Sequence, residues 1–193
     1  MGILRNKFYT IYFPLLLAVP LFISSCGHHK EIEKTESKKP EHVKAENPPA
    51  HSSNKIEKKY ASLLNVKENE ISNVKLYAFI DDWYGVPYKY GGKNKSGIDC
   101  SNFTATLYNT IYNKSITGSS SSIFNQCKAV PKSDLQEGDL LFFKIEQEGI
   151  SHIGVYLQNN KFVHATTKKG VMIDDLDEAY YKKYFYKAGR LAK

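Results

Sequence analysis

The sequence has few of the residues that build disulfide networks and metal clusters. Only three of its 193 residues are cysteines, namely Cys26, Cys100 and Cys127. His28 and His29 follow Cys26, but the flanking sequence offers no further ligand at the spacing of a metal site. We therefore expect no bound metal. A disulfide between Cys100 and Cys127 stays open as one alternative, and it excludes any role of Cys100 as a free thiol.

The sequence also lacks a concentrated charge of one sign and any internal repeat. Its formal net charge is +7, which falls to +5 when the two basic residues Arg5 and Lys7 are left out. Basic charge this diffuse does not indicate a nucleic-acid partner. Hydrophobic residues make up 41% and aromatic residues 13% of the chain, which suits one globular domain with a proper core and some non-globular sequence.

The N-terminal residues 1–25 have the three parts of an export signal. Arg5 and Lys7 precede an apolar run over residues 8–23, which two prolines interrupt and which is short for a membrane-spanning helix. The residues that follow, Ile-Ser-Ser-Cys, resemble the bacterial lipobox, in which the signal is removed ahead of a cysteine whose thiol is lipidated. We expect Cys26 to become the lipidated N-terminus and to anchor the protein on a membrane. An uncleaved membrane anchor is the alternative.

A polar segment separates this signal from the rest of the chain. Residues 26–54 consist mainly of Lys, Glu, Pro, Ser and His, with almost no large apolar residue. This composition is typical of a disordered tether. We therefore expect a lipoprotein signal peptide at residues 1–25, a tether at residues 26–54 and one folded domain at residues 55–193.

A tight glycine-containing turn leads to a helix that begins beside Cys100. Asp99 is a favoured N-cap residue, and Phe103, Leu107 and Ile111 recur every four residues as one apolar helix face. Cys100 then lies in the first helical turn, where free backbone N–H groups and the helix dipole favour a thiolate and are suited to holding an oxyanion. The alternative is a structural role, because a lone cysteine on a helix is more often a small buried hydrophobe.

The spacing of the apolar residues predicts helices before Cys100 and strands after it. We expect helices near residues 56–64 and 74–84, the second packing beside the helix that begins at Cys100. Residues 118–122 and 131–138 are expected to form loops that border a cleft. The expected strands are residues 139–145, 151–157, 161–165, 170–173 and 185–191. Helices followed by closely spaced strands indicate an α+β domain with an antiparallel sheet.

Two of the predicted strands each carry one histidine, and the register between the strands decides whether the histidines meet. A two-residue turn at residues 159–160 points His152 and His164 to opposite faces of the sheet. A three-residue loop at residues 158–160 instead sets His164 opposite Gly154 and puts His152 diagonally adjacent on the same face. A joint role of the two histidines therefore requires the three-residue loop.

The same register divides the other side chains of these strands between the two faces. One face becomes apolar and is expected to be the core side, while both histidines face the helix of Cys100. The apolar face consists of Ile153, Val155, Val163 and Ala165. Two unrelated histidines share a face about half the time, so this parity is a necessary condition for a joint role and no proof of one.

Five blocks of sequence follow one another between residues 55 and 193. The blocks are Gly-Val-Pro-Tyr-Lys-Tyr-Gly-Gly, Asp-Cys-Ser-Asn-Phe, Glu-Gly-Asp-Leu-Leu-Phe-Phe, Ser-His-Ile-Gly-Val-Tyr-Leu and Lys-Phe-Val-His-Ala. Together, and in this order, they resemble the NlpC/p60 family of bacterial cell-wall cysteine peptidases. The resemblance implies a compact papain-like NlpC/p60 fold.

The resemblance implies a catalytic role for four residues. Cys100 is expected to be the nucleophile, His152 the base that takes its proton, and His164 the polar residue that orients His152. Tyr88 matches the tyrosine whose hydroxyl joins the oxyanion hole in this family.

Asp99 and Ser101 match the family residues on either side of the nucleophile and are expected to line the substrate site. The family usually has glycine where this sequence has Asn102. A side chain at this position either crowds the cleft or points away from it. The departure therefore bears on substrate detail more than on catalysis.

The activity implied by the resemblance is hydrolysis of amide bonds in peptidoglycan stem peptides, typically the bond between D-γ-glutamate and a diamino acid, during murein remodelling. No cofactor is implied, and the expected partners are wall peptides and, through the N-terminal lipid, a membrane. We expect a monomer in the cell envelope, on the outer membrane if the cell is Gram-negative. Two other classes stay open: a non-catalytic envelope lipoprotein that binds wall peptides, and an amidase or acyltransferase on the same fold.

Overall fold

The structure is a computed structural model that describes residues 50–191. The expected export signal, the lipidation site Cys26 and the tether as far as residue 49 lie outside the described residues. All described residues belong to one compact unit, Ala45–Lys193. The first described helix begins at Ala50, upstream of the domain boundary expected at Lys55. No helix within residues 50–191 is long and apolar enough to cross a membrane.

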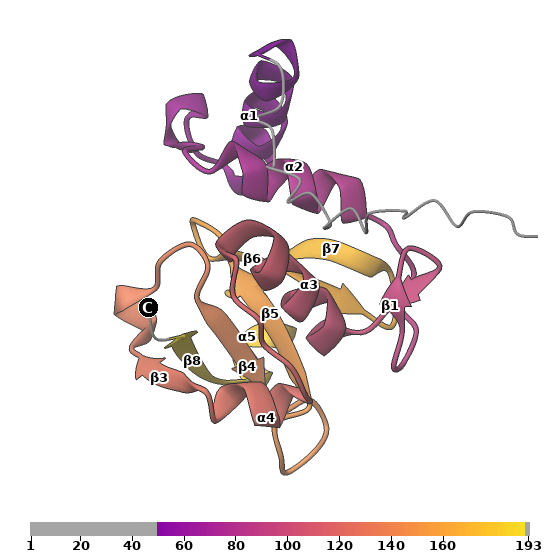
Figure 1. Cartoon of the computed structure of the whole chain (residues 1–193). Helices are drawn as coiled ribbons and strands as arrows, with labels where there is room; N and C mark the ends of the chain where they lie inside the picture. Colours follow the sequence, from indigo (N-terminus) through magenta and orange to yellow (C-terminus); the bar gives the residue numbers. More distant parts are fainter. Residues whose placement is uncertain (1–49, 192–193) are drawn as a thin grey trace, which may run out of the picture. The chain divides into compact units, whose positions relative to one another are not determined.

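Three longer helices and one short helix precede the strands of the main sheet along the chain, and a second short helix lies between its last two strands (Figure 1). The helices are α1 (Ala50–Leu64), α2 (Val74–Trp83), α3 (Cys100–Tyr112), α4 (Ser120–Phe124) and α5 (Ala179–Tyr184). Short 3₁₀ turns occupy Glu68–Glu70 and Lys132–Asp134. The helices expected near residues 56–64 and 74–84 are confirmed, and so is the helix that begins at Cys100.

The strands form one six-stranded sheet and a small hairpin. In the six-stranded sheet the order is β3-β8-β4-β5-β6-β7, and every neighbouring pair is antiparallel. Its strands are β3 (Cys127–Val130), β4 (Leu140–Phe143), β5 (His152–Tyr156), β6 (Lys161–Thr166), β7 (Gly170–Asp175) and β8 (Phe185–Leu191). The hairpin pairs β1 (Lys93–Asn94) with β2 (Gly97–Ile98) just ahead of α3. The expected α+β class with an antiparallel sheet is confirmed.

The first face of the sheet packs against α3 (Figure 1). Phe103 and Leu107 of α3 are fully buried in this core. The apolar face predicted for β5 and β6 belongs to the same core, and its members are Ile153, Val155, Val163 and Ala165. Alternation along a strand then sends the remaining side chains of β5 and β6 to the opposite face.

The second face of the sheet packs against α5 and carries both histidines. The core on this face contains Phe143 of β4, Phe162 of β6 and Tyr181 of α5. The ring of His152 lies 5.8 Å from that of Phe143, and the ring of His164 lies 4.6 Å from that of Phe162. The prediction that the histidines face the helix of Cys100 is therefore wrong, because the apolar face of β5 and β6 already occupies that side.

Helix α2 packs against α3 through aromatic side chains. The ring of Phe103 lies 6.1 Å from Phe79 and 6.2 Å from Trp83, both on α2, as the sequence predicts for these neighbouring helices. After α2 the chain enters the loop that contains Tyr88, which bridges to Ile98 of β2. Because β2 leads directly into α3, this pairing brings the loop beside the start of α3.

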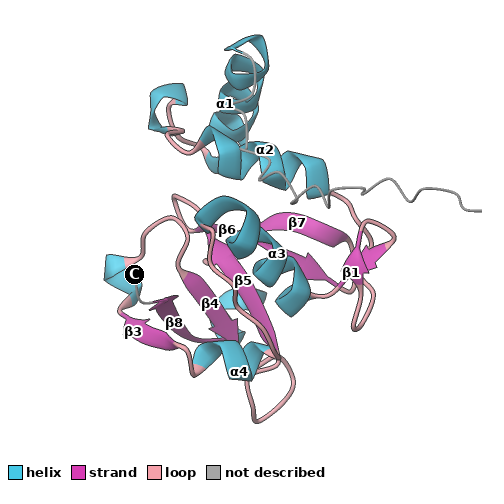
Figure 2. Cartoon of the chain, viewed as in Figure 1, coloured by secondary structure: helices cyan, strands magenta, loops and turns pink. Residues whose placement is uncertain are grey.

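Several elements of the structure differ from the sequence prediction (Figure 2). The serine-rich segment expected to be a loop forms α4, where Ser119 Oγ accepts from the backbone N–H of Ser122 at 3.2 Å and Ile123 is fully buried. Strand β3, helix α5 and the hairpin of β1 and β2 were not predicted. These elements are too short for periodicity to reveal, and tertiary packing stabilises them.

Candidate active site

Asp99 holds the start of α3. Its Oδ1 accepts from the backbone N–H of Asn102 at 2.7 Å, which confirms the predicted N-cap. Ser101 Oγ donates to the same oxygen at 2.9 Å, and Asn102 Nδ2 donates to Oδ2 at 2.9 Å. The carboxylate is buried with both oxygens bonded. Asp99 therefore fixes Ser101 and Asn102, the two residues that follow Cys100. Asp99, Cys100, Ser101 and Asn102 all line one cavity.

Asp99 also ties the loop that contains Tyr88 to α3. The backbone N–H of Gly91 donates to Asp99 Oδ2 at 2.9 Å, and Gly91 has a φ of 69°, which favours glycine. Tyr88 is half-buried and lines the same cavity as Cys100. None of the hydrogen bonds within the described residues uses the Tyr88 hydroxyl.

Cys100 is buried in the first turn of α3, with 7% of its surface exposed. Its Sγ lies 3.8 Å from Ser120 Oγ of α4. Burial raises the pKa of the thiol, while Ser120 and the backbone N–H groups of Ile153 and Ser101 lower it by less. The pKa of Cys100 therefore lies above its ordinary value. The backbone N–H groups at this position favour the thiolate, as expected, but burial of the charged form outweighs them.

Cys127 does not pair with Cys100. Both cysteines are free, so the alternative of a disulfide between them is not realised. Cys127 lies half-buried on β3, where its Sγ donates to the carbonyl oxygen of Ile123 at 3.3 Å. Burial raises the pKa of Cys127 to about 11. Its thiol is therefore neutral at physiological pH and serves packing.

The two histidines form a hydrogen-bonded pair. His152 Nε2 lies 2.7 Å from His164 Nδ1. β5 and β6 pair with Val155 opposite Val163, which is the register of the three-residue loop, so that prediction is confirmed. The hydrogen-bonded pairing of β5 with β6 ends at Val155 and Val163, and His152 and His164 lie beyond that end. The loss of pairing there gives the two imidazoles room to meet edge to face.

A carboxylate and a phenol extend the histidine pair. His164 Nε2 lies 2.9 Å from Asp174 Oδ2, and the Tyr181 hydroxyl donates to the same oxygen at 2.5 Å. His164 pairs with Met172 in the ladder between β6 and β7, so Asp174, two residues on, shares its face. The sequence motifs identify neither Asp174 nor Tyr181. Strand parity in β7 was a usable signal for Asp174, whereas no sequence signal places Tyr181 over the sheet.

The surroundings set the charges of this chain of side chains. Burial lowers the pKa of His152 and of His164; His164 lowers the pKa of His152 further, and Asp174 acts against both shifts. Both imidazoles are therefore neutral at neutral pH. Burial raises the pKa of Asp174, but hydrogen bonds from His164 and Tyr181 outweigh it. The pKa of Asp174 lies below its ordinary value, so this carboxylate is ionised.

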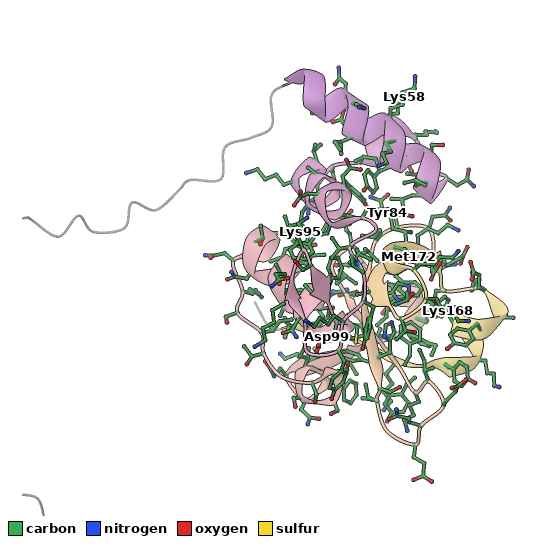
Figure 3. All side chains as sticks on the ribbon, turned by 90° about the vertical axis from the view of Figure 1, so that its right-hand side faces the viewer. Lys58, Tyr84, Lys95, Asp99, Lys168 and Met172 are labelled. Carbon is green, nitrogen blue, oxygen red and sulfur yellow. The ribbon has the colours of Figure 1, made fainter. Side chains whose placement is uncertain are left out.

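Two cavities adjoin at the candidate residues. Cys100 lines one of about 530 Å³, and both histidines line the other, of about 590 Å³. The two cavities share Tyr88, Gln147 and Ser151 as lining residues. Figure 3 labels Asp99, which lines the first cavity, and Lys168 and Met172, which line the second.

The backbone at the start of β5 lies beside the thiol of Cys100. The backbone N–H of Ile153, the residue after His152, acts on the Cys100 thiol. The side chain of His152 points to the other face of the sheet, and no hydrogen bond joins it to Cys100 in the part of the chain that the structure describes. The site thus contains a thiol at the start of α3 and an oriented imidazole at the start of β5.

Comparison with known families assigns the chain. The model of the NlpC/P60 family matches residues 85–190. The chain belongs to the NlpC/P60 family. This NlpC/P60 protein is 38% identical over 128 residues to the murein DD-endopeptidase MepS/murein LD-carboxypeptidase of Escherichia coli K12, a match that covers 64% of this chain and 68% of that protein. The family resemblance of the sequence blocks is thereby confirmed.

Solved structures of the family share the fold. An NlpC/P60 family protein from Bacillus cereus is 28% identical with a TM-score of 0.56, over 61% of this chain and 39% of that one. The NlpC/p60 domain of the peptidoglycan hydrolase SagA is 24% identical with a TM-score of 0.53, over 63% of this chain and 100% of that domain. The likeness to the Bacillus cereus protein therefore concerns less than half of its length, and the likeness to the SagA domain shows the fold alone.

Proposed function

We propose that this NlpC/P60 protein is a cysteine peptidase that hydrolyses amide bonds in the peptides of peptidoglycan. The observation that carries the proposal is the hydrogen bond of 2.7 Å between His152 and His164, which line a cavity that adjoins the cavity of the buried Cys100. The name of the Escherichia coli relative, a murein endopeptidase, supports the same substrate class. A thiol, a neutral base and a residue that orients the base are the groups that this chemistry requires.

The first step transfers a proton from Cys100 to His152. Because Nε2 of His152 is engaged with His164, Nδ1 is the nitrogen that accepts the proton. In the structure Sγ lies beside Ser120, so this transfer requires a contact with His152 that forms when substrate is bound, as catalytic hydrogen bonds often do. The thiolate then attacks the amide carbonyl carbon and forms a tetrahedral intermediate.

The intermediate collapses by the usual route of thiol acyl transfer. The imidazolium of His152 protonates the leaving amine through Nδ1, which leaves an acyl thioester on Cys100. His152 then takes a proton from water, which hydrolyses the thioester and restores the thiol. Tyr88 and the backbone at the start of α3 line the cavity of Cys100, and we expect them to stabilise the oxyanion in both steps, where one donor typically contributes roughly 10²- to 10³-fold in rate.

Two classes of bond are candidates for the substrate. The family resemblance favours the bond between D-γ-glutamate and a diamino acid. The relative from Escherichia coli is named a murein DD-endopeptidase and murein LD-carboxypeptidase. Its name adds two candidate bonds: one between two D-configured residues, and one that joins a terminal D-residue to an L-residue.

Mass spectrometry of purified wall peptides incubated with the protein under reducing conditions tests this function. New fragments from the wild type, and none from Cys100→Ala, are expected, and their masses identify the bond. Equal fragmentation by Cys100→Ala would contradict the assignment of the nucleophile. Peptide binding without cleavage by either protein would instead favour a non-catalytic envelope protein, and products with a new acyl acceptor would favour an acyltransferase.

We also propose that the protein works in the cell envelope as a lipoprotein held through Cys26. The sequence supports this in its export signal and in the lipobox-like residues that precede Cys26. The polar tether then lifts the domain from the membrane, which is the outer membrane if the cell is Gram-negative. Metabolic labelling with palmitate is expected to mark the wild type and a Cys127→Ala control, and not Cys26→Ala; unlabelled wild type would leave the uncleaved anchor as the explanation.

A further inference from the structure

The hydrogen-bonded chain behind His152 does not end at the second histidine. It runs from His152 through His164 to Asp174, with distances of 2.7 and 2.9 Å, and Tyr181 closes it with a hydrogen bond of 2.5 Å to the carboxylate. Only 1% of the His164 side chain and 13% of the Asp174 side chain are exposed. Water therefore has little access to His164 and Asp174 and does not readily replace these hydrogen bonds.

We propose that Asp174 and Tyr181 are positioning residues that act through His164 to hold His152 in the one tautomer that accepts a proton from Cys100. The proposal builds on the catalytic function proposed above and extends the site by two residues on β7 and α5. The direction of the hydrogen bonds in this chain of residues follows from the chemistry of the groups and can be measured without substrate.

The carboxylate sets the direction of the chain. An ionised carboxylate only accepts hydrogen bonds, so His164 must carry its proton on Nε2 to bond Asp174. A neutral His164 then has an unprotonated Nδ1, which can only accept. His152 must therefore donate from Nε2, and its own Nδ1 is left unprotonated. Asp174 thus fixes the tautomers of both histidines and leaves the lone pair of His152 Nδ1 free for the thiol proton.

Without the carboxylate the direction of the chain is lost. His164 can then hold its proton on Nδ1 and donate to Nε2 of His152, which moves the proton of His152 to Nδ1. In that tautomer His152 has no lone pair to offer Cys100. Tyr181 supports the carboxylate because its hydroxyl occupies a lone pair of Oδ2 and keeps Asp174 in the orientation that His164 needs.

The neighbouring charges do not supply a substitute carboxylate in this position. Glu178, at the start of α5, and Lys169, in the turn before β7, act on the chain through space only. Asp175 lies next to Asp174 in β7 but bonds Lys161 at 2.5 Å. Asp175 is therefore a matched control, since it is a carboxylate on the same strand outside the chain.

The decisive experiment measures histidine tautomers and turnover in the full-length chain. Nitrogen-15 NMR distinguishes protonated from unprotonated imidazole nitrogens, and the wild type and Asp175→Asn are expected to show Nε2 protonated in His152 and His164. Asp174→Asn is expected to show a mixture. Its kcat on wall peptides is expected to fall about tenfold or more at unchanged KM, because carboxylates that orient histidines contribute on this scale or above.

Two results would overturn the proposal: wild-type tautomers in Asp174→Asn, or the same loss of kcat in Asp174→Asn and Asp175→Asn. If Asp174→Asn does not fold, Tyr181→Phe decides, because it keeps the ring and removes only the hydroxyl. A reduced kcat relative to a Tyr184→Phe control supports the proposal, and equality with that control overturns it. If the wild type cleaved no wall peptide, the tautomers alone would still test the chain.

Discussion

Asn102 Nδ2 donates a hydrogen bond of 2.9 Å to Asp99 Oδ2, so the residue that replaces the usual glycine of the family is bonded to the N-cap residue of α3. The same oxygen accepts from the backbone N–H of Gly91 in the loop that contains Tyr88. Asn102 also lines the cavity of Cys100. Its side chain therefore completes the bonding of a buried carboxylate at the wall of the site.

Asn102→Gly is expected to lower the free energy of unfolding by about 1–2 kcal/mol, since it removes a hydrogen bond to a charged and buried group. Urea denaturation followed by circular dichroism measures this change. The matched control is Asn109→Gly, an exposed position in the same helix, where only the helix propensity changes, by a few tenths of a kcal/mol. Equal losses in the two variants would show that the bond to Asp99 contributes nothing.

Much of this fold follows from patterns of one or two residues that local physics decides. Asp99 caps α3 because its short carboxylate reaches the backbone N–H of Asn102, and this was predictable from the sequence. The histidine pair was predictable as one of two registers, since a strand alternates its side chains. The sequence left the choice to the turn, where Asn159 and Asn160 both adopt positive φ.

Other parts of the site depend on packing that no local pattern encodes. The sheet buries both faces, so an apolar set on β5 and β6 did not reveal which side α3 covers. α4 is too short to predict from periodicity, yet it brings Ser120 to the thiol of Cys100. Tyr181 reaches Asp174 only because α5 lies against the second face of the sheet. The pKa of Cys100 likewise depends on its burial, which outweighs its helical position.

Ser120→Ala is expected to raise the pKa of the Cys100 thiol further. The Ser120 hydroxyl lies 3.8 Å from Sγ and stabilises the thiolate, so its loss leaves desolvation less opposed. The pH dependence of alkylation by iodoacetamide measures this shift. Ser121→Ala is the control, because Ser121 is an exposed residue of the same helix that bonds only Ser119 through its side chain. Identical alkylation profiles in both variants would contradict the prediction.

Tyr88→Phe is expected to reduce kcat by roughly 10²- to 10³-fold with little change in stability, because it removes one donor to the oxyanion and keeps the ring. Steady-state kinetics on the cleaved wall peptide, together with thermal denaturation, measure both effects. Tyr90→Phe is the control, since Tyr90 lines the same cavity and is exposed. A wild-type kcat in Tyr88→Phe would remove Tyr88 from the oxyanion hole.

The pH dependence of kcat/KM is expected to show an acid limb below pH 6.5, the ordinary pKa of histidine. His152 acts as a base only when neutral, and burial together with His164 lowers its pKa well below that value, although Asp174 opposes the shift. A lowered pKa means that more acid is needed to protonate His152, so the base stays competent as the pH falls through 6.5.

The same shift predicts how stability changes with pH. Since the unfolded chain binds a proton at His152 near pH 6.5 and the folded protein does so only at lower pH, the unfolded state holds more protons between the two pKa values. The free energy of unfolding is therefore expected to be full above pH 6.5 and to fall as the pH drops toward the folded pKa. Chemical denaturation at several pH values measures how the free energy of unfolding changes with pH. Replacement of His152 by Gln is expected to make the free energy of unfolding depend less on pH in this range. An acid limb at or above pH 6.5, or a stability that does not depend on His152 in this range, would show that the folded protein does not lower the pKa of its base.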